Sequence, residues 1–338
     1  MASRSRFALP SVVPAGGWER MLRAYREIGG VLQEVHDLGQ PGVWIDLVKP
    51  DETEIKKVSE VTGLLPEFLS AALDPEERPH HEFEDEQAVI VIRVPAARSD
   101  VEYVTIPLGV VVAHDCLVTV CLEDNPVVRG LVNNAKVHPG KKTRLLLQIL
   151  YRTARQYLDS VHRLYSKAEH LEAVLVRSMR NVEMFELTEI QKSFVYLTTA
   201  LRANHIVMDK LLRSRLRPVE EGDAGGSPLR LYPDDEDLLE DAMTENEQAL
   251  SMAEVYSDIL TNTMDAFASI ISNNLNIVMK FLAAVTIILA VPQVIGTFFG
   301  MNVQVPLAST PGGFAIIVLV SVLVSLGATI FLWRRRML

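Results

Sequence analysis

The chain has 338 residues, of which 49% are apolar, and a formal net charge of −10 at pH 7. This acidic balance, without a compact basic patch, argues against a nucleic-acid partner. Two cysteines are too few for a disulfide-stapled scaffold, and the first ten residues lack the long apolar stretch of a cleaved secretory signal.

Residues 1–142 are predicted to form a cytosolic α/β domain. Four stretches rich in β-branched residues predict strands, at residues 43–48, 88–94, 103–112 and 116–122. A helix is expected to begin at Asp51, because acidic residues occupy its first turn, and another at Pro66. This part of the chain contains no glycine-rich phosphate-binding loop.

Cys116 and Cys121 lie in the last of these predicted strands. Because side chains alternate along a strand, a spacing of five residues places the two cysteines on opposite faces of the sheet. We therefore expect two buried free thiols rather than a disulfide or a metal site.

The middle of the chain predicts two long antiparallel helices. Apolar residues recur at helical spacing among many charges over residues 143–181 and 187–217, so residues 143–217 are expected to form a helical hairpin. Residues 218–232, which contain the chain's clearest cluster of Gly, Pro and Ser, are interpreted as a linker.

After the linker, one helix is predicted over residues 233–299, a length of about 100 Å at about 1.5 Å per residue. Its only proline after the first residue is Pro292. Such a helix is too long for one small domain to bury, so we expect it to pack against the hairpin or against its own copies. Residues 231–279 contain eleven acidic residues and no basic one, which suggests that this stalk faces the Lys and Arg of the hairpin, in the same or a neighbouring subunit.

Two stretches near the C-terminus are predicted to cross a membrane. Residues 281–299 and 314–333 are uncharged, and each is close to the ~20 residues that span a lipid bilayer. Basic residues flank the pair, whereas the connecting residues 300–313 have none. By the positive-inside rule the connection is an external loop, and both termini lie in the cytoplasm of a multi-pass cell-membrane protein. Residues 334–338 form a basic tail.

Side chains that follow one another at steps of seven, four or eleven residues share nearly one face of a helix. From Glu247 such steps pass from acidic to amide and then to small or hydroxyl-bearing residues: Glu254, Asp258, Asp265, Asn276, Ala283, Ala290 and Thr297, with Thr286 and Gln293 one step aside. Around a symmetry axis this face would offer rings of oxygen, the ligand that hard divalent cations prefer. Two spans cannot enclose an aqueous pore, so several protomers would share it.

Two plainer interpretations of this face stay open. An acidic stripe is often only a solvated helix face. A Thr or Gln inside a span often bonds only to a neighbouring helix.

The tripeptide Gly300-Met301-Asn302 ends the first span, Asn276-Ile-Val-Met-Lys280 precedes that span, and arginines close the chain. Together these features resemble the CorA family of divalent-cation channels. The resemblance covers the whole chain in architecture, with its sharp motifs near the C-terminus. It implies an α+β membrane protein: a homopentameric funnel of α/β domains, helical hairpins and very long stalk helices that continue into the pore-lining spans. It further implies no enzymatic activity and no cofactor, with Mg²⁺ as the transported and regulatory ion.

By this resemblance, Gly300, Met301 and Asn302 would form the outer selectivity ring, where the Asn302 amide and backbone carbonyls hold a hydrated Mg²⁺. Asn276 would form a gate ring at the cytosolic entrance, followed by Met279. A basic ring would surround the entrance, formed by Lys280, Arg334, Arg335 and Arg336. The loop after the tripeptide lacks the acids of many relatives, and Phe299 replaces a usual tyrosine.

The family also senses internal Mg²⁺ through carboxylates between neighbouring cytosolic domains. The stalk carboxylate of that sensor maps onto Asp241, and on the α/β domain only Asp100 has the right chemistry for its partner. Mg²⁺ and the basic hairpin would then compete for stalk carboxylates, which connects ion concentration to channel opening.

Three other functions are considered. Co²⁺ and Ni²⁺ are further candidate ions for such a channel. A Zn²⁺ transporter of the same superfamily, passive or proton-coupled, fits the acid-free loop, although the pore face lacks the His and Cys that zinc usually recruits. A membrane-anchored enzyme or sensor would use residues 78–85, which are dense in metal-ligand types, but adjacent His80 and His81 face opposite ways in a strand.

Overall fold

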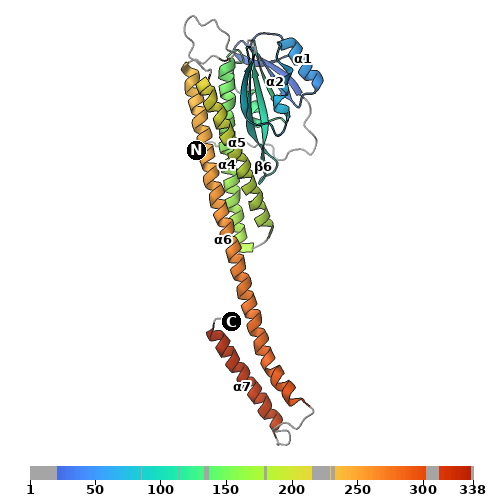
Figure 1. The fold of residues 1–338 in the computed structure, drawn as a ribbon, viewed down its shortest axis with the longest axis vertical. Helices are drawn as coiled ribbons and strands as arrows, with labels where there is room; N and C mark the ends of the chain where they lie inside the picture. The colour runs from blue at the N-terminus through green and yellow to red at the C-terminus, as the bar shows by residue number, and fades with distance from the viewer. Residues whose placement is uncertain are drawn as a thin grey trace, which may run out of the picture. The chain divides into compact units, whose positions relative to one another are not determined.

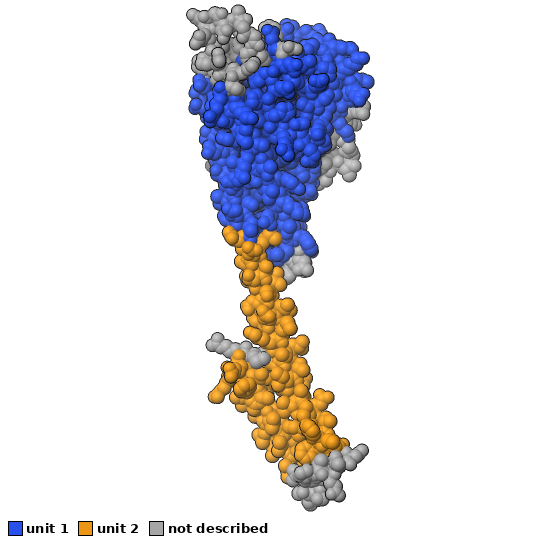
Figure 2. Space-filling view, in the orientation of Figure 1, with its two compact units in different colours: residues 1–261 blue, residues 262–338 orange. Residues whose placement is uncertain are grey.

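The structure is a computed structural model that describes residues 21–84, 86–113, 115–132, 137–178, 181–214, 229, 233–301 and 312–335. The chain divides into two compact units, residues 1–261 and residues 262–338 (Figure 2). The first contains a β-sheet, its covering helices and a helical hairpin, and the second contains two apolar helical segments.

One seven-stranded sheet organises the first unit, in the order β2-β1-β3-β7-β6-β5-β4. Its central strands β3 and β7 run parallel and are buried along their whole length, as expected for strands covered on both faces. The other neighbouring strands are antiparallel. The strands are β1 (Met21–Ile28), β2 (Val31–Val35), β3 (Val43–Val48), β4 (His80–Glu84), β5 (Gln87–Ala97), β6 (Tyr103–Val112) and β7 (Cys116–Cys121).

Helices cover both faces of this sheet. On one face, α1 and α2 contribute buried side chains such as Val58 and Phe68. On the other, α3, α4, α5 and the start of α6 share a core that includes Leu131, Leu146 and Met208. The helices are α1 (Glu52–Thr62), α2 (Pro66–Ser70), the 3₁₀ helix η1 (Ala71–Leu73), α3 (Pro126–Val132), α4 (Lys142–Ser178), α5 (Asn181–Ser214), α6 (Pro233–Phe299) and α7 (Gly313–Arg334).

The start of α1 confirms the prediction made from its acidic first turn. The Glu54 backbone N–H donates to Asp51 Oδ1 at 2.9 Å, and the Asp51 N–H donates to Glu54 Oε2 at 3.1 Å, which together form a capping box. Gly63 ends the helix in the left-handed region, with φ of 72°.

The two thiols are buried and free, as predicted. Cys116 packs in the core beneath α1 and α2, and Cys121 packs in the core on the opposite face of the sheet. Burial raises the pKa of Cys116 to about 11, so its thiol is protonated at neutral pH.

In the first unit, α4, α5 and the first part of α6 lie side by side (Figure 1). Buried positions on α5 and α6 alternate at spacings of three and four residues, the heptad pattern of coiled-coil packing. On α6 they are Leu239, Ala242, Asn246, Ala249, Ala253 and Leu260, with half-buried Tyr256 completing the pattern.

The first helix of the hairpin ends at Ser178, and the second begins at Asn181, earlier than the predicted start at residue 187. The spacing of apolar residues did not indicate this earlier start, because Val182 and Phe185 are exposed, at 62% and 71%, and so do not belong to a buried helix face.

The basic hairpin faces the acidic stalk within the same subunit. Arg144 of α4 lies 3.2 Å from Asp235 of α6, and Arg155 lies 3.2 Å from Glu245. These pairs explain the separation of basic and acidic residues along the sequence.

The described residues contain two helices long and apolar enough to cross a membrane, α6 over its second half and α7. Large apolar side chains there are mostly exposed in the single chain, for example Leu289 at 67% and Leu319 at 59%. The core helix of a soluble protein would bury them, so this exposure fits contact with lipid or with other subunits. The fold class predicted from sequence, with a long helix that continues into the first span, is confirmed. The finer division into domains stays a prediction.

Candidate ion-conduction site

The membrane part of α6 has one covered side and one bare side. Ala284 is fully buried and Ile288, Val291 and Ile295 are half-buried, at the spacing of one helix face. Within the second unit α7 is the other described helix, and its Leu332 is 5% exposed. We conclude that α7 packs on this side of α6.

Most of the predicted pore-lining residues are uncovered in the single chain. The side chains of Asn276, Met279, Ala283, Thr286, Gln293 and Thr297 are exposed, and that of Ala290 is half-buried. At 100° per residue Thr286, Gln293 and Thr297 fall roughly opposite Ala284 and Ile295, whereas Asn276 and Ala283 lie nearer the edge of the covered side. The hydroxyl and amide groups within the span therefore lie on the side that α7 leaves open.

The threonine hydroxyl groups on the bare side already donate hydrogen bonds within their own helix. Thr286 Oγ1 donates to the Leu282 carbonyl at 2.8 Å, and Thr297 Oγ1 donates to the Gln293 carbonyl at 2.7 Å. Each oxygen keeps lone pairs that accept hydrogen bonds. Water molecules around a cation point their hydrogens outward, so these oxygens suit an ion that keeps its water shell.

The predicted selectivity tripeptide begins where α6 ends. The Gly300 N–H donates to the Gly296 carbonyl at 2.9 Å and to the Thr297 carbonyl at 3.2 Å, which closes the last turn. A Cβ on residue 300 would lie 3.2 Å from the Gly296 oxygen, tighter than an ordinary contact. Met301 follows with 53% exposure, and Asn302 lies outside the described residues.

The predicted stalk carboxylates differ in their surroundings. Glu254 accepts hydrogen bonds from Arg202 of α5, at 2.6 Å and 3.1 Å, and so belongs to the contacts between hairpin and stalk. Asp241, Asp258 and Asp265 are exposed on α6.

Asp100, the predicted partner of Asp241, is exposed in the loop between β5 and β6. Among the described residues, no group of three or more His, Cys, Asp or Glu side chains is placed to hold a metal ion. Within one chain the described residues therefore do not assemble a complete metal site around either carboxylate.

The predicted basic ring is only partly described. Lys280 is exposed on α6, and Arg334 and Arg335 are exposed at the end of α7. The Arg335 guanidinium lies 5.6 Å from the centre of the Phe331 ring. Arg336 lies outside the described residues.

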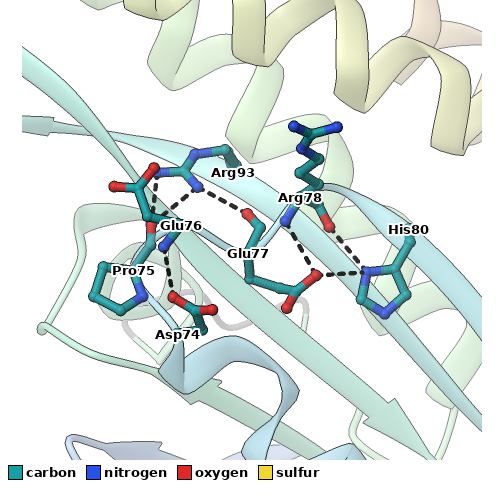
Figure 3. A network of polar contacts seen from close by, with 7 residues as sticks. All are labelled: Asp74, Pro75, Glu76, Glu77, Arg78, His80 and Arg93. Carbon is teal, nitrogen blue, oxygen red and sulfur yellow. Dashed lines mark hydrogen bonds and ion pairs between the residues drawn. The ribbon is translucent and has the colours of Figure 1, made fainter.

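The ligand-rich segment before β4 is held by ordinary structural contacts (Figure 3). The Arg93 guanidinium of β5 donates to the backbone carbonyls of Pro75, at 3.1 Å, and Glu77, at 2.8 Å. His80 Nδ1 lies 2.9 Å from the Arg78 carbonyl and 3.4 Å from Glu77 Oε1. These polar groups hold the loop against the sheet, and the described residues of this segment form no cluster of three or more ligands.

The adjacent histidines lie in β4, as the strand argument requires. Burial lowers the pKa of His81. Its neighbour Phe83 packs edge-on at a centroid distance of 5.5 Å, while Asp85 lies outside the described residues. This geometry gives no support to an anchored enzyme or metal sensor at this segment.

Sequence reasoning missed a buried polar group in the sheet. Asp46 of β3 is 6% exposed and accepts a hydrogen bond from Thr119 Oγ1 at 2.7 Å. The Trp44 indole N–H donates to the same hydroxyl oxygen at 3.0 Å. The only sequence signal was an aspartate inside an otherwise apolar strand.

Comparison with known proteins identifies the family. A family model described as CorA-like Mg²⁺ transporter protein matches residues 39–336. A curated relative, the cobalt/magnesium transport protein CorA of Methanocaldococcus jannaschii, is 27% identical over 303 residues, covering 87% of this chain and 90% of the relative.

Solved structures agree. The complete structure of the CorA magnesium transporter from M. jannaschii matches with a TM-score of 0.76 and 25% identity, covering 93% of this chain and 98% of that one. The cytoplasmic domain of ZntB from Vibrio parahaemolyticus matches with a TM-score of 0.55 and 12% identity, over 77% of this chain and 99% of that one, which shows a shared fold alone. Because the family model extends over most of the chain, this protein belongs to the family of CorA-like Mg²⁺ transporter proteins.

Proposed function

We propose that the chain is one subunit of a homopentameric channel that conducts hydrated Mg²⁺ across the cell membrane, with both termini in the cytoplasm. The family consists of ion transporters and not of enzymes. The observation that carries the proposal is the two-sided first span: α7 covers one side of α6, and Thr286, Gln293 and Thr297 lie on the side left bare, together with apolar side chains such as Leu289.

In water a bare polar face is unremarkable, but in hydrocarbon every polar group needs a partner. The Thr286 and Thr297 hydroxyls donate to carbonyls of their own helix, but the Gln293 amide would lack partners if this side of α6 faced lipid. A ring of α6 helices around a shared axis would place these groups against water and ions instead. This requirement favours an oligomer whose pore is lined by α6, and five subunits is the number that the family resemblance implies.

The chemistry of the lining favours a hydrated divalent ion. Neutral oxygens accept hydrogen bonds from the water shell without stripping it, and Mg²⁺ loses its waters reluctantly. Carboxylates at the same depth would bind the ion too tightly for release. The relative's role in cobalt/magnesium transport supports Mg²⁺ first, with Co²⁺ and Ni²⁺ as further ions. In this proposal Gly300, Met301 and Asn302 form the outer ring.

An isosteric pair of substitutions tests the lining. Thr286→Val removes a hydroxyl oxygen from the bare side, and Thr329→Val removes a comparable hydroxyl from α7, where it donates to the Ser325 carbonyl at 2.8 Å. Flux of Mg²⁺ into liposomes should fall for Thr286→Val and stay near wild type for Thr329→Val. Equal effects of the two substitutions would contradict the assignment of the pore face.

Regulation by internal Mg²⁺ is the second part of the proposal. Arg155 and Arg202 neutralise Glu245 and Glu254, whereas Asp241 and Asp258 are exposed. Mg²⁺ bound at the exposed carboxylates, or in competition with the arginines, would change how the stalk is held. Asp100 and Asp265 would supply further ligands.

Neutralising Asp241 and Asp258 together, to asparagine, should leave Mg²⁺ currents less inhibited by internal Mg²⁺. Unchanged inhibition would exclude these two carboxylates as the sensor. Asp237→Asn combined with Glu240→Gln, which also removes two charges from exposed residues of the same helix, is the matched control for a change of stalk charge.

A further inference from the structure

Three contacts along α4 and α6 keep a constant register. Arg144 pairs with Asp235, Arg155 pairs with Glu245, and the Tyr165 and Tyr256 rings stack with centroids 3.9 Å apart and planes at 14°. The partners differ in residue number by 90 or 91 in all three contacts, so the two helices run parallel without slipping. A shift of α6 by one turn would break all three contacts together.

Contacts between α5 and α6 depend on the same axial position of α6. Gln191 Nε2 donates to Thr261 Oγ1 at 2.9 Å, and Arg202 pairs with Glu254 at 2.6 Å. Both contacts with α5 are largely exposed to solvent, whereas the acidic side chains of the α4 pairs are mostly buried, Asp235 at 3% and Glu245 at 20%. Exposed polar contacts of this kind contribute little to stability, so they resist a shift of α6 only weakly.

The apolar packing of α6 specifies its register only in part. Ala242, Ala249 and Ala253 occupy three of the buried positions of this face, and all are 0% exposed. A displacement of α6 by one turn would exchange alanine for alanine at one site and would bring Leu239 or Tyr256 to an alanine site. Apolar packing therefore opposes such a shift, and a buried polar group on the same face adds to that opposition.

Asn246 is a buried polar residue in the middle of this face. Its side chain is 0% exposed, and Nδ2 donates to the Leu201 carbonyl of α5 at 3.1 Å (α5 and α6, Figure 1). Its Oδ1 is buried without a hydrogen-bond partner in the part of the chain that is described. A one-turn shift would remove the Nδ2 bond as well and leave the whole amide unpaired in the core, which is costly.

We propose that Asn246 is a positioning residue that fixes the axial register of α6 on the α4–α5 hairpin, and with it the resting conformation of the pore helix. A single buried asparagine sets register in coiled coils at some cost in stability. Because α6 is one continuous helix from Pro233 to Phe299, an axial shift at Asn246 is carried toward the membrane span. This consequence for the pore rests on the proposed function, whereas the register itself does not.

Cysteine cross-linking in the purified full-length protein measures the register. The pair Gln191→Cys and Thr261→Cys reports the observed register, and the pair Gln191→Cys with Ser257→Cys reports a stalk displaced by one turn. Cys116 and Cys121 can stay in place, because both are buried and burial raises the pKa of each thiol. A short bifunctional thiol reagent gives the ratio of the two yields.

With Asn246 intact, we expect the 191–261 pair to exceed the 191–257 pair by at least about tenfold, which corresponds to about 1.4 kcal/mol. Asn246→Leu removes the unpartnered amide and should lower this ratio at least about threefold without lowering the melting temperature. Ala249→Ser, a polar change at the next buried position, should leave the ratio unchanged. Asn246→Ala replaces the leucine variant if leucine does not fit the core.

The proposal would be overturned if the cross-linking ratio of the folded Asn246 variants stayed within about twofold of the wild-type ratio. Failure of the protein to transport Mg²⁺ would overturn the proposed function and leave the cross-linking ratio as a valid test of register. Among variants with a lowered cross-linking ratio, those with the lowest ratio should show the weakest inhibition of transport by internal Mg²⁺. Inhibition that does not vary with the ratio would refute the connection between the register of α6 and the pore.

Discussion

Asp46→Asn should stabilise the protein at neutral pH. Burial raises the pKa of Asp46 from 3.8 to about 6; the hydrogen bond from Thr119 opposes that shift, Asp124 adds to it and Arg23 opposes it. The folded state therefore binds the proton more tightly than the unfolded chain. Ionisation of Asp46 destabilises the fold above pH 6, and the lost stability returns as the pH falls from about 6 toward 3.8.

The magnitude follows from the shift. About two pH units at 1.36 kcal/mol each give an upper limit of about 3 kcal/mol well above pH 6. Asparagine keeps an oxygen for the Thr119 hydroxyl but adds an amide N–H₂ that needs an acceptor, so we expect a gain of about 1–3 kcal/mol. For a domain of this size that corresponds to roughly 2–10 °C in melting temperature.

Thermal unfolding of the full chain in detergent, followed by tryptophan fluorescence, provides the assay. Trp44 donates to Thr119 and so reports on this network directly. The gain in melting temperature from Asp46→Asn should be largest at pH 8, fall to about half at pH 5 and disappear below about pH 3.8. Asp159→Asn, at an exposed aspartate of α4, is the control and should follow wild type. An equal gain at pH 5 and pH 8 would refute the reasoning.

Three further outcomes are expected. Cys116 and Cys121 should react with a maleimide at least about 100-fold more slowly in the folded protein than in urea. Both thiols are buried, and the pKa of Cys116 is raised from 9.0 to about 11. Equal reaction rates in the two conditions would show that the strand is open. Gly300→Ala should lower Mg²⁺ flux without lowering protein yield, since its Cβ would crowd the Gly296 carbonyl at 3.2 Å, and wild-type flux would show that this turn tolerates a side chain. Arg202→Ala should lower the free energy of unfolding, measured in denaturant, by less than about 1 kcal/mol, because the ion pair of Arg202 with Glu254 is exposed. A larger loss would mean that this ion pair is shielded from solvent by other subunits.

Local signals predicted the parts of the fold that local chemistry determines. The β-branched runs at β3 and β6 matched the strands residue for residue, and Asp51 marked the start of α1. The hairpin of β1 and β2 was not predicted, because the apolar residues of β1 do not alternate strictly with its charged ones and its pairing with β3 is a tertiary contact.

The candidate site was predictable only in part. The spacing of polar residues in α6 selected side chains that are exposed or half-buried in the single chain, and whether they line a pore stays a prediction. Glu254 was expected among the metal-binding carboxylates, and its contact with Arg202 depends on how two distant helices pack. Asn246 gave no signal in the sequence, because an asparagine among alanines resembles an exposed helix face until its neighbours are known.

The most direct test of the central claim is ion flux into liposomes that contain only the purified protein. Mg²⁺ and Zn²⁺ entry would be compared with and without a pH gradient, and repeated with Asn302→Ala. The account predicts Mg²⁺ entry that ignores the pH gradient and is abolished by the substitution. Zn²⁺ entry that follows the proton gradient, without Mg²⁺ entry, would contradict it.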